Sequence, residues 1–169
     1  MKSQQQLFAR LVQGLKPGTL SWIGLRPDHK AAMTPVNTVM AIEKLGLEGD
    51  HRCKKTPGSG RQVTIISEEY IQQTAHYMGL KNIPADLLRR NLVVKNINLT
   101  ALRYQQFSIG EAIFEATALC HPCSRMEKAL GKGAVAAMLG HGGLCAKIIQ
   151  GGQLQVGDAV TLILPEAPA

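Results

Sequence analysis

The sequence contains two stretches with the same order of residue types, QFSIGEAIFEA at 106–116 and QLQVGDAVTLI at 153–163. Each has an apolar segment, then Gly-Glu-Ala or Gly-Asp-Ala, and then a second segment rich in Ile, Val, Phe or Thr, which are residue types that favour β-strands. A glycine next to an acidic residue between two such segments is a turn signal. Since nothing else recurs at this spacing, we interpret both stretches as tight turns of one β-barrel rather than as units of a repeat.

Glycine and proline residues divide the whole chain into similar short segments. Its 17 Gly and 8 Pro separate short apolar runs, which predicts many short strands. The predicted strands are GTLSWIGL (18–25), VNTVMAI (36–42), RQVTIIS (61–67), NLVV (91–94), AIFEAT (112–117), LCAKII (144–149) and AVTLIL (159–164). The fold class that we predict is therefore mainly β, a β-barrel with a few short helices.

Three helical segments are predicted between these strands. An acidic pair directly after Ser67 suits the positive end of a helix dipole, and apolar residues at helical spacing lead from there to a terminating Gly79. A short turn, PADLLRR at 84–90, opens with proline, which is favoured at the first helical position. The third segment is SRMEKAL at 124–130, followed by AVAAML at 134–139.

Length and composition are those of one ordinary globular domain. The chain has 169 residues, of which 45% are hydrophobic and 18% charged, and a chain of this size can bury a core without disulfides. We therefore predict one domain over residues 1–169, with its core at about 18–164. Because no apolar run is long enough for a secretory signal or a membrane span, we expect a cytoplasmic protein without membrane contact, whose four cysteines stay reduced.

The net charge of +7 is unevenly distributed along the chain. Residues 1–99 hold 14 Lys or Arg against 7 Asp or Glu, whereas residues 100–169 hold 5 of each sign. A basic face attracts nucleic acid or a phosphorylated small molecule. Because only 4% of the residues are aromatic, the chain has few stacking platforms for single-stranded nucleic acid. We expect a small-molecule or cofactor ligand rather than nucleic acid.

The stretch CHPC concentrates the chemistry of the sequence. Pro122 interrupts the preceding strand, so a helix begins at or just after Cys123. The unpaired N–H groups and the dipole at a helix N-terminus, together with the nearby Arg125, favour the thiolate, which is the form that attacks sulfur and binds soft metals. Cys120 lies at the end of the strand without this help. We predict Cys123 as the active thiol and Cys120 as a bystander or resolving partner.

Two other interpretations of the cysteines stay open. Cys120 and Cys123 have the C-x-x-C spacing of half a zinc site, His51 and Cys53 form a possible second pair, and GHGGLC at 140–145 offers further ligands. The His-x-Cys pair does not match the usual spacing of a zinc knuckle. A zinc-stapled barrel would be a binding module whose basic face binds nucleic acid, and in the third interpretation the cysteines are plain buried residues.

Six stretches occur in a characteristic order: GLEGDH (46–51), RQVTIIS (61–67), LLRRNLVV (87–94), FSIGEAIFEAT (107–117), PCSRME (122–127) and GHGGLCAKIIQGGQLQVGDAV (140–160). From Gly18 to Leu164 the chain resembles the MOSC family, the domain found at the C-terminus of molybdenum cofactor sulfurases. The resemblance implies a barrel of the pyruvate-kinase-barrel type and a pocket whose hallmark cysteine aligns with Cys123.

The same resemblance implies a function. Family members bind the molybdenum cofactor or carry sulfur as a cysteine persulfide, and in reductase relatives the cysteine is a molybdenum ligand and the substrates are N-hydroxylated compounds. Whether this chain is an enzyme stays open, with an oxidoreductase or a sulfur-transfer protein as the possibilities. A sulfur donor or a redox partner protein is then a possible partner. Pyridoxal phosphate, the cofactor of the sulfurases' other domain, is not expected in this chain.

Further candidate site residues lie in these stretches. Asp50 and His51 follow a glycine at a strand-to-loop junction, where His51 could donate to an oxo or pterin group while Asp50 fixes its tautomer, so they join Cys123 as candidate catalytic residues. The alternative is a capped glycine turn. Guanidinium groups suit phosphate, and the glycines of GHGGL offer backbone N–H groups to an anion, although solvated arginines and a simple loop are equally compatible with the pattern. The candidate cofactor-binding residues are Arg61, Arg89, Arg90, Asn91, Arg125, His141 and Gly142.

Overall fold

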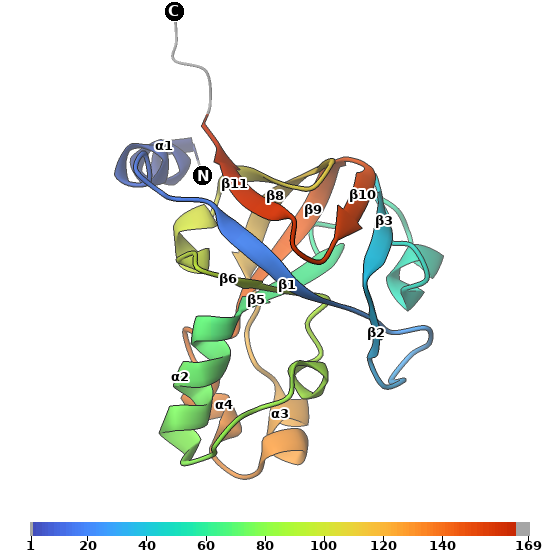
Figure 1. Cartoon of the computed structure of the whole chain (residues 1–169), viewed down its shortest axis with the longest axis vertical. Helices are drawn as coiled ribbons and strands as arrows, with labels where there is room; N and C mark the ends of the chain where they lie inside the picture. Colours follow the sequence, from blue (N-terminus) through green and yellow to red (C-terminus); the bar gives the residue numbers. More distant parts are fainter. Residues whose placement is uncertain (1, 165–169) are drawn as a thin grey trace, which may run out of the picture.

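Seven strands close into a barrel (Figure 1). The structure is a computed structural model that describes residues 2–164, with side chains described from residue 3 onward. Around the barrel the order is β11 (Ala159–Ile163), β7 (Gln106–Ile109), β8 (Ala112–Leu119), β9 (Leu144–Gln150), β5 (Val63–Ser67), β6 (Leu92–Lys95) and β1 (Gly18–Leu25), and β1 pairs back to β11. The pair β5–β6 is parallel and the other neighbours are antiparallel. The predicted β-barrel with a few short helices is confirmed; the predicted domain limits include residue 1 and residues 165–169, which lie outside the described part.

Four short strands lie beside the barrel. Strand β2 (Thr34–Val36) extends the sheet at β1, and a separate three-stranded sheet has the order β10 (Gly152–Gln155), β3 (Thr38–Ile42) and β4 (Gly46–Leu47). The single strand predicted over 36–42 is therefore two strands with a break at Asn37. This break allows β2 to remain with the barrel while β3 joins the small sheet.

The two echoing stretches form different connections. The first is a hairpin between β7 and β8, with Gly110 at a φ of +56° in its turn. The second is not a hairpin, because β10 pairs with β3 while β11 pairs with β7, so the turn at Gly157 carries the chain from the small sheet into the barrel. The two turns contact each other, since the Glu111 N–H donates to the Gln153 carbonyl (3.1 Å) and the Gln153 N–H to the Glu111 carboxylate (3.0 Å). Both stretches thus contain a tight turn between two strands, as predicted, but only the first turn joins two strands of the barrel.

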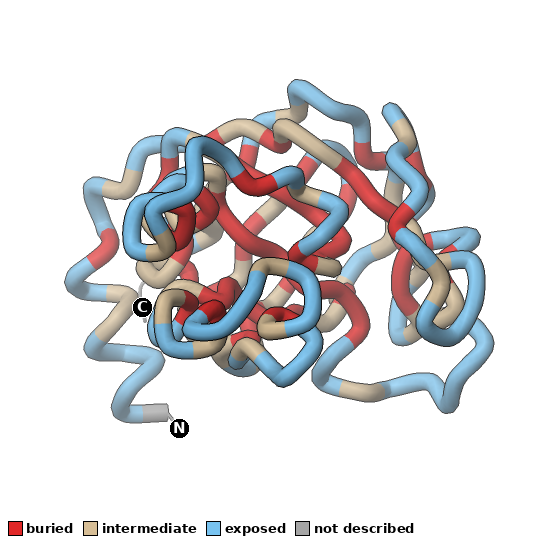
Figure 2. Tube along the Cα trace, turned by 90° about the horizontal axis from the view of Figure 1, so that it is seen from below, coloured by how far each residue is buried: buried red, intermediate tan, exposed pale blue. Residues whose placement is uncertain are grey.

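Apolar side chains fill the barrel, and Figure 2 shows where the buried residues lie along the chain. Buried residues concentrate along its strands, while the outer loops and the N-terminal helix are largely exposed. Phe107 and Phe114, fully buried on paired strands, stack with ring centroids 5.6 Å apart. All five residues of β5 are buried, because one face of this strand lies in the barrel and helices cover the other. A strand buried on both faces is a rigid support for groups placed at its ends.

Three helices gather on one side of the barrel: α2 (Glu68–Met78), α3 (Ser124–Leu130) and α4 (Ala134–Met138) (Figure 1). They enclose a second apolar cluster with the outer faces of β5 and β6. Helix α2 begins and ends as predicted: the Ser67 hydroxyl accepts from the Tyr70 N–H (3.2 Å), and Gly79 ends the helix at a φ of +65°.

The remaining helical elements are short or peripheral. The 3₁₀ turns are η1 (His51–Lys54), η2 (Ala85–Leu88) and η3 (Leu99–Leu102), and η2 is the turn predicted from PADLLRR. Helix α1 (Lys2–Leu11) was not predicted; it is mostly polar and exposed, and Phe8 anchors it edge-on against Tyr104 with ring centroids 5.5 Å apart. Within residues 2–164, no helix combines the length and the apolar character needed to cross a bilayer.

Candidate functional site

A cavity of about 230 Å³ lies where β5 and β6 begin and the chain turns after β8. Its lining is strongly basic: Arg26, Arg52, Lys55, Arg61, Arg89, Arg90 and Arg125. The other lining residues are His51, Gln62, Thr64, Asn91, Cys120, His121, Cys123 and Met126. Among the described residues, no Asp or Glu lines it. Such a concentration of like charge in a concave surface attracts an anion.

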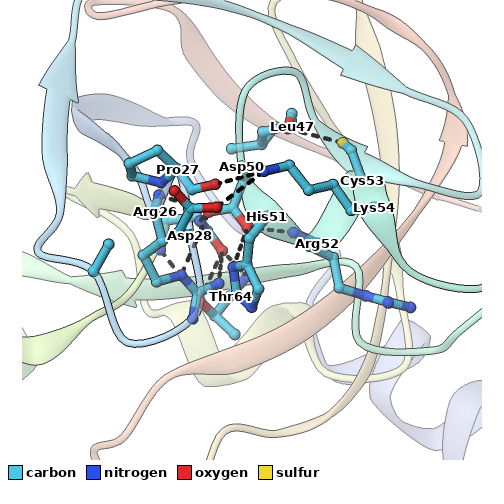
Figure 3. A network of polar contacts seen from close by, with 12 residues as sticks. Arg26, Pro27, Asp28, Leu47, Asp50, His51, Arg52, Cys53, Lys54 and Thr64 are labelled. Atoms are coloured by element: carbon cyan, nitrogen blue, oxygen red, sulfur yellow. Dashed lines mark hydrogen bonds and ion pairs between the residues drawn. The ribbon is translucent and has the colours of Figure 1, made fainter.

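Asp50 is the centre of a network of polar contacts beside this cavity (Figure 3). It is only 3% exposed, and its carboxylate accepts from the backbone N–H groups of Arg26 and Arg52, both at 2.9 Å, and from the Asn91 amide at 2.9 Å. Burial by itself raises the pKa of the Asp50 carboxyl, but these backbone hydrogen bonds and the Arg26 charge outweigh it, so the pKa is lower than usual. The carboxylate stays ionised beneath the cavity. Asp50, predicted as a catalytic residue, does not line the cavity, and its hydrogen bonds hold the backbone at Arg26 and Arg52, which do.

The side chain of Asn91 is also hydrogen-bonded within the protein. Its side-chain oxygen accepts from the backbone N–H (3.2 Å) and the hydroxyl (3.1 Å) of Thr64, and its amide nitrogen donates to the Gly24 carbonyl (3.2 Å) as well as to Asp50. These bonds join β1, β5 and the segment before β6. Asn91 was predicted to bind cofactor, but its buried amide is already used within the protein. Its role in the structure is to fix the strands that carry the arginines.

His51 lines the cavity at the start of η1. Its Nδ1 lies 3.2 Å from Asp50 Oδ1, yet the geometry does not make a hydrogen bond, and this buried nitrogen has no hydrogen-bond partner among the described residues. Burial and the positive charge of Arg26 lower the pKa of His51, against the opposing effect of Asp50. The imidazole is therefore neutral at neutral pH and can exchange a proton with a bound group.

This lowered pKa predicts a pH dependence of stability. The unfolded chain takes up a proton at His51 near the ordinary pKa of 6.5 while the folded protein does not, so the free energy of unfolding falls as the pH drops through this value. In His51→Gln the fall between pH 7 and pH 5, measured by urea unfolding, is expected to be smaller than in the wild type. His76→Gln, at an exposed histidine of α2, is the control and should retain the full fall. An undiminished fall in His51→Gln would contradict the assignment.

Arg89 and Arg90 behave differently from each other. Arg90 is 6% exposed and donates to the carbonyls of Gly142 (2.8 Å), Leu88 (2.9 Å) and Cys120 (3.4 Å). It therefore connects the segment before β6 to residues 120–123, which we call the cysteine loop. Arg89 donates to the Ala31 carbonyl (2.9 Å), and its buried Nε has no partner among residues 3–164. Burial, with Arg26 and Arg125 nearby, lowers the pKa of Arg89. This shift reflects a crowding of cations that a bound anion would relieve.

Arg61 contacts two sulfurs. Its Nε donates to Cys145 Sγ (3.0 Å), and its Nη2 lies 3.9 Å from Cys120 Sγ. A hydrogen bond from Cys120 and the Arg61 guanidinium, acting against burial, lower the pKa of Cys145 to about 6, whereas the hydrogen bond to Cys145 and burial raise the pKa of Cys120. Arg61 lines the cavity as predicted, but its partners are thiols, which the sequence did not indicate.

Cys123 is the exposed thiol of the site. It is the N-cap residue of α3, at the helix start where the sequence placed it, and its side chain makes no capping hydrogen bond. Arg125 lies two residues after Cys123, and it is also exposed and also lines the cavity. Cys123 therefore presents a free sulfur to a ligand in the cavity.

Besides Asp50, two predicted site residues, His141 and Gly142, do not line the cavity. His141 lies between the rings of Tyr70 and Tyr77, with centroids 5.2 and 6.1 Å away, and its Nδ1 is 3.1 Å from the Leu139 carbonyl. Gly142 packs its backbone against Cys120, where a side chain would overlap the Cys120 carbonyl, and its own carbonyl accepts from Arg90. The GHGGL loop, predicted as an anion nest, therefore does not line the basic cavity, and at Gly142 its backbone packs against Cys120.

The zinc interpretation gains no support from the structure. Cys53 donates to the Leu47 carbonyl (3.0 Å) and does not line the cavity with Cys120 and Cys123. Over residues 2–164, no three side chains of His, Cys, Asp or Glu come together in a way that could hold a metal ion. A structural zinc ion needs four ligands.

Several cavity residues were missed by the sequence analysis. Arg26, Arg52, Lys55 and His121 line the cavity, and none was predicted. The charged run DHRCKK at 50–55 was a signal for two of them. Arg26 had no local signal, since the contact with Asp50 that places it spans 24 positions of the sequence.

Comparison with known proteins agrees with this architecture. The family model of the MOSC domain matches residues 49–161, about two thirds of the chain. The chain belongs to the MOSC domain family. This match includes the cysteine loop and most of the basic cavity of the MOSC barrel, and it confirms the resemblance seen in the sequence.

Solved structures share the MOSC barrel at low sequence identity. The YuaD protein from Bacillus subtilis is 17% identical, with a TM-score of 0.75 and with 88% of this chain and 96% of that chain covered. YiiM from Geobacillus stearothermophilus is 16% identical (TM-score 0.70, 86% and 75% covered), and YiiM from Escherichia coli is 18% identical (TM-score 0.66, 89% and 72% covered). At these identities the likeness shows the fold alone. A comparison with curated proteins gives no significant match.

Proposed function

We propose that this MOSC protein binds the molybdenum cofactor in the basic cavity, with Cys123 as a thiolate ligand of the metal. The observation that carries the proposal is the combination of seven basic side chains, no acidic lining residue within the described chain, and an exposed cysteine at the same cavity. A phosphate-bearing cofactor with a soft metal centre matches both features, since arginine forks suit phosphate and thiolate suits a soft metal.

The residues present fit the anionic part of such a cofactor. Arg125 makes no hydrogen bond or ion pair within residues 3–164, and the buried Nε of Arg89 has no partner there, so both have donors to offer. The cavity of about 230 Å³ is smaller than the roughly 300–1,000 Å³ of most small-molecule pockets. It therefore suits one charged end of the cofactor, while the remainder would lie along the open surface.

Each residue then has a defined task. Bound molybdenum would supply two-electron redox chemistry. Cys123 would hold the metal, Arg89 and Arg125 would bind the phosphate, and His51, neutral at pH 7, would accept or return a proton. Asp50 and Asn91 would act through Arg26, whose backbone and side chain they hold. A reductase of N-hydroxylated compounds is the reaction class that the family membership favours.

Sulfur carriage is the second candidate function, and the exposure of Cys123 favours it. In this reaction the Cys123 thiolate attacks the terminal sulfur of a persulfide donor. The new S–S bond forms on Cys123 while the donor's S–S bond breaks, and the donor leaves as a thiolate. A donor protein could reach Cys123, whereas it could not reach the buried Cys120 and Cys145.

Replacing Arg125 tests the anion-binding part of the proposal. Arg125→Gln is expected to weaken binding of molybdopterin about 10- to 150-fold, because a hydrogen bond to a charged group contributes about 1.5–3 kcal/mol. Binding can be followed by the fluorescence of the pterin at two salt concentrations. Arg10→Gln is the matched control, because Arg10 is exposed on α1 and does not line the cavity. This variant should bind molybdopterin as the wild type does. Equal affinities for all three proteins would contradict the proposed site.

A further inference from the structure

A second cavity, of about 660 Å³, lies outside the barrel between α2, the segment 80–85 and the strands β1 and β6. Among the described residues, none lines both this cavity and the basic one. Its volume is within the roughly 300–1,000 Å³ of most small-molecule pockets. The proposed function makes no use of this cavity, so a ligand bound there would be independent of the molybdenum cofactor.

An irregularity in β1 directs two consecutive side chains to this cavity. The pairing of β1 with β6 shifts its register between Leu20 and Trp22, which makes Ser21 the extra residue of a β-bulge. Leu20 and Ile23 flank the bulge, and both belong to the barrel core. Ser21 and Trp22 therefore both lie on the outer side of β1, where they line the cavity. Bulges of this kind redirect side chains beside functional sites.

The indole of Trp22 is held in place in the wall of the cavity. A Cβ at Gly24 would overlap the indole and would lie 2.9 Å from Met33 Cε, so the ring occupies space that only a glycine leaves free. The ring also packs against the apolar cluster under α2, yet Trp22 is not fully buried. An indole that is fixed and still accessible offers a stacking surface to an aromatic ring.

The floor of the cavity is apolar. Its buried members, between 2% and 8% exposed, are Ile71, Ala75, Ile83 and Val93. Burying the apolar body of a ligand on this floor removes water from both surfaces, which is favourable. The floor and the indole together fit an aromatic ring.

Polar side chains lie at the two ends of the cavity. Glu68, Gln72 and His76 follow one another at intervals of four residues, so they share one face of α2. At about 1.5 Å per residue, Glu68 and His76 are about 12 Å apart along the helix. Lys81 and Asn82 line the cavity just beyond the end of α2. One end therefore offers a carboxylate acceptor, and the other offers a cation and an amide.

The separation of these ends determines which ligand charges fit. Lys81 has no ion-pair partner within residues 3–164, because Glu68 lies at the other end of the cavity. A carboxylate on the ligand would accept from the Lys81 ammonium and the Asn82 amide. Glu68 accepts only, so the opposite end of the ligand needs a hydrogen-bond donor.

We propose that this cavity binds a small aromatic carboxylate, with its ring against Trp22 and its carboxylate at Lys81 and Asn82. A hydroxyl group on the far side of the ring donates to Glu68. Binding is non-covalent, and no bond is made or broken. The probe that combines these groups is 3-(4-hydroxyphenyl)propionate. Tyramine is its matched control, since it has the same ring and an ammonium group in place of the carboxylate.

Trp22 reports binding directly, because it is the single tryptophan of the chain. The full-length protein is titrated with each compound while the tryptophan fluorescence is recorded. We expect a saturable change with 3-(4-hydroxyphenyl)propionate, and at least about 10-fold weaker binding of tyramine, whose cation meets Lys81 instead of pairing with it.

Lys81→Gln tests the carboxylate position. It is expected to weaken binding of 3-(4-hydroxyphenyl)propionate about 3- to 10-fold, between the effects of an exposed ion pair and of a buried charged hydrogen bond. Lys132→Gln replaces an exposed lysine that lines neither cavity, and this control should bind as the wild type does. Both substitutions are at exposed side chains, so both variants should fold.

Two kinds of result would overturn the proposal. The first is a wild-type protein whose fluorescence shows no saturable change with 3-(4-hydroxyphenyl)propionate. The second is an affinity that does not depend on the carboxylate, seen as equal binding of tyramine or as unchanged binding in Lys81→Gln. Neither result depends on molybdenum, so failure here leaves the proposed cofactor site untouched, and failure of that site leaves this one standing.

Discussion

Gly143→Ala is expected to lower the free energy of unfolding by about 2–5 kcal/mol. Gly143 has a φ of +94°, a region in which a non-glycine residue costs roughly 1–2 kcal/mol. A Cβ at this position would also overlap the carbonyl oxygen of Ile65 in β5. Since β5 is buried on both faces, it cannot move aside cheaply, and overpacking adds about 1–3 kcal/mol. This backbone also positions Cys120, which lines the cavity, because the Cys120 N–H donates to the Gly143 carbonyl (2.8 Å).

Gly140→Ala is the matched control for this effect. Gly140 lies in the same loop at a φ of +80°, but a Cβ there would meet no atom within 4 Å. Gly140→Ala is therefore expected to lower the free energy of unfolding only by the cost of the positive φ, about 1–2 kcal/mol. Urea unfolding of the two variants and the wild type measures the difference. Equal losses in both variants would show that the contact with Ile65 does not constrain the loop.

The strands and main helix could be predicted because their signals are local. Strand β1 occupies the whole predicted range 18–25, and α2 begins after Ser67 and ends before Gly79 as expected. The second echoing stretch was misassigned because pairing depends on a distant partner: β10 finds β3, more than 100 positions earlier in the chain. Periodicity gives the strand but not its neighbour.

The residues of the candidate site also divide into those with a local sequence signal and those without one. Cys123, Arg61 and the arginine pair at 89–90 were visible from residue type and from a helix start, and all of them line the cavity. What residue type could not show is which polar groups the fold uses internally, so the sequence did not reveal that the Asp50 carboxylate is buried and bonded to Arg26, Arg52 and Asn91. The contacts of Arg61 with Cys120 and Cys145 were invisible for the same reason, because the β8–β9 register brings these two cysteines to one part of the barrel.

Cys123→Ala is expected to remove molybdenum from the protein. In the proposed site this thiolate is the only ligand to the metal that the chain supplies, and the arginines bind the anionic part alone. The substitution removes an exposed side chain that makes no capping hydrogen bond, so the fold should be unaffected. Loss of metal without loss of stability would separate the ligand role from a structural one.

The measurement that tests this most directly is the ratio of molybdenum to protein by elemental analysis. The untagged chain would be purified without chelators from cells that make the molybdenum cofactor, together with Cys123→Ala and with Cys53→Ala, a control cysteine outside the cavity. Near one molybdenum per chain is predicted in the wild type and in Cys53→Ala, and at least about tenfold less in Cys123→Ala. A wild-type protein without molybdenum, or equal amounts in Cys123→Ala, would contradict the assignment of Cys123 as the metal ligand.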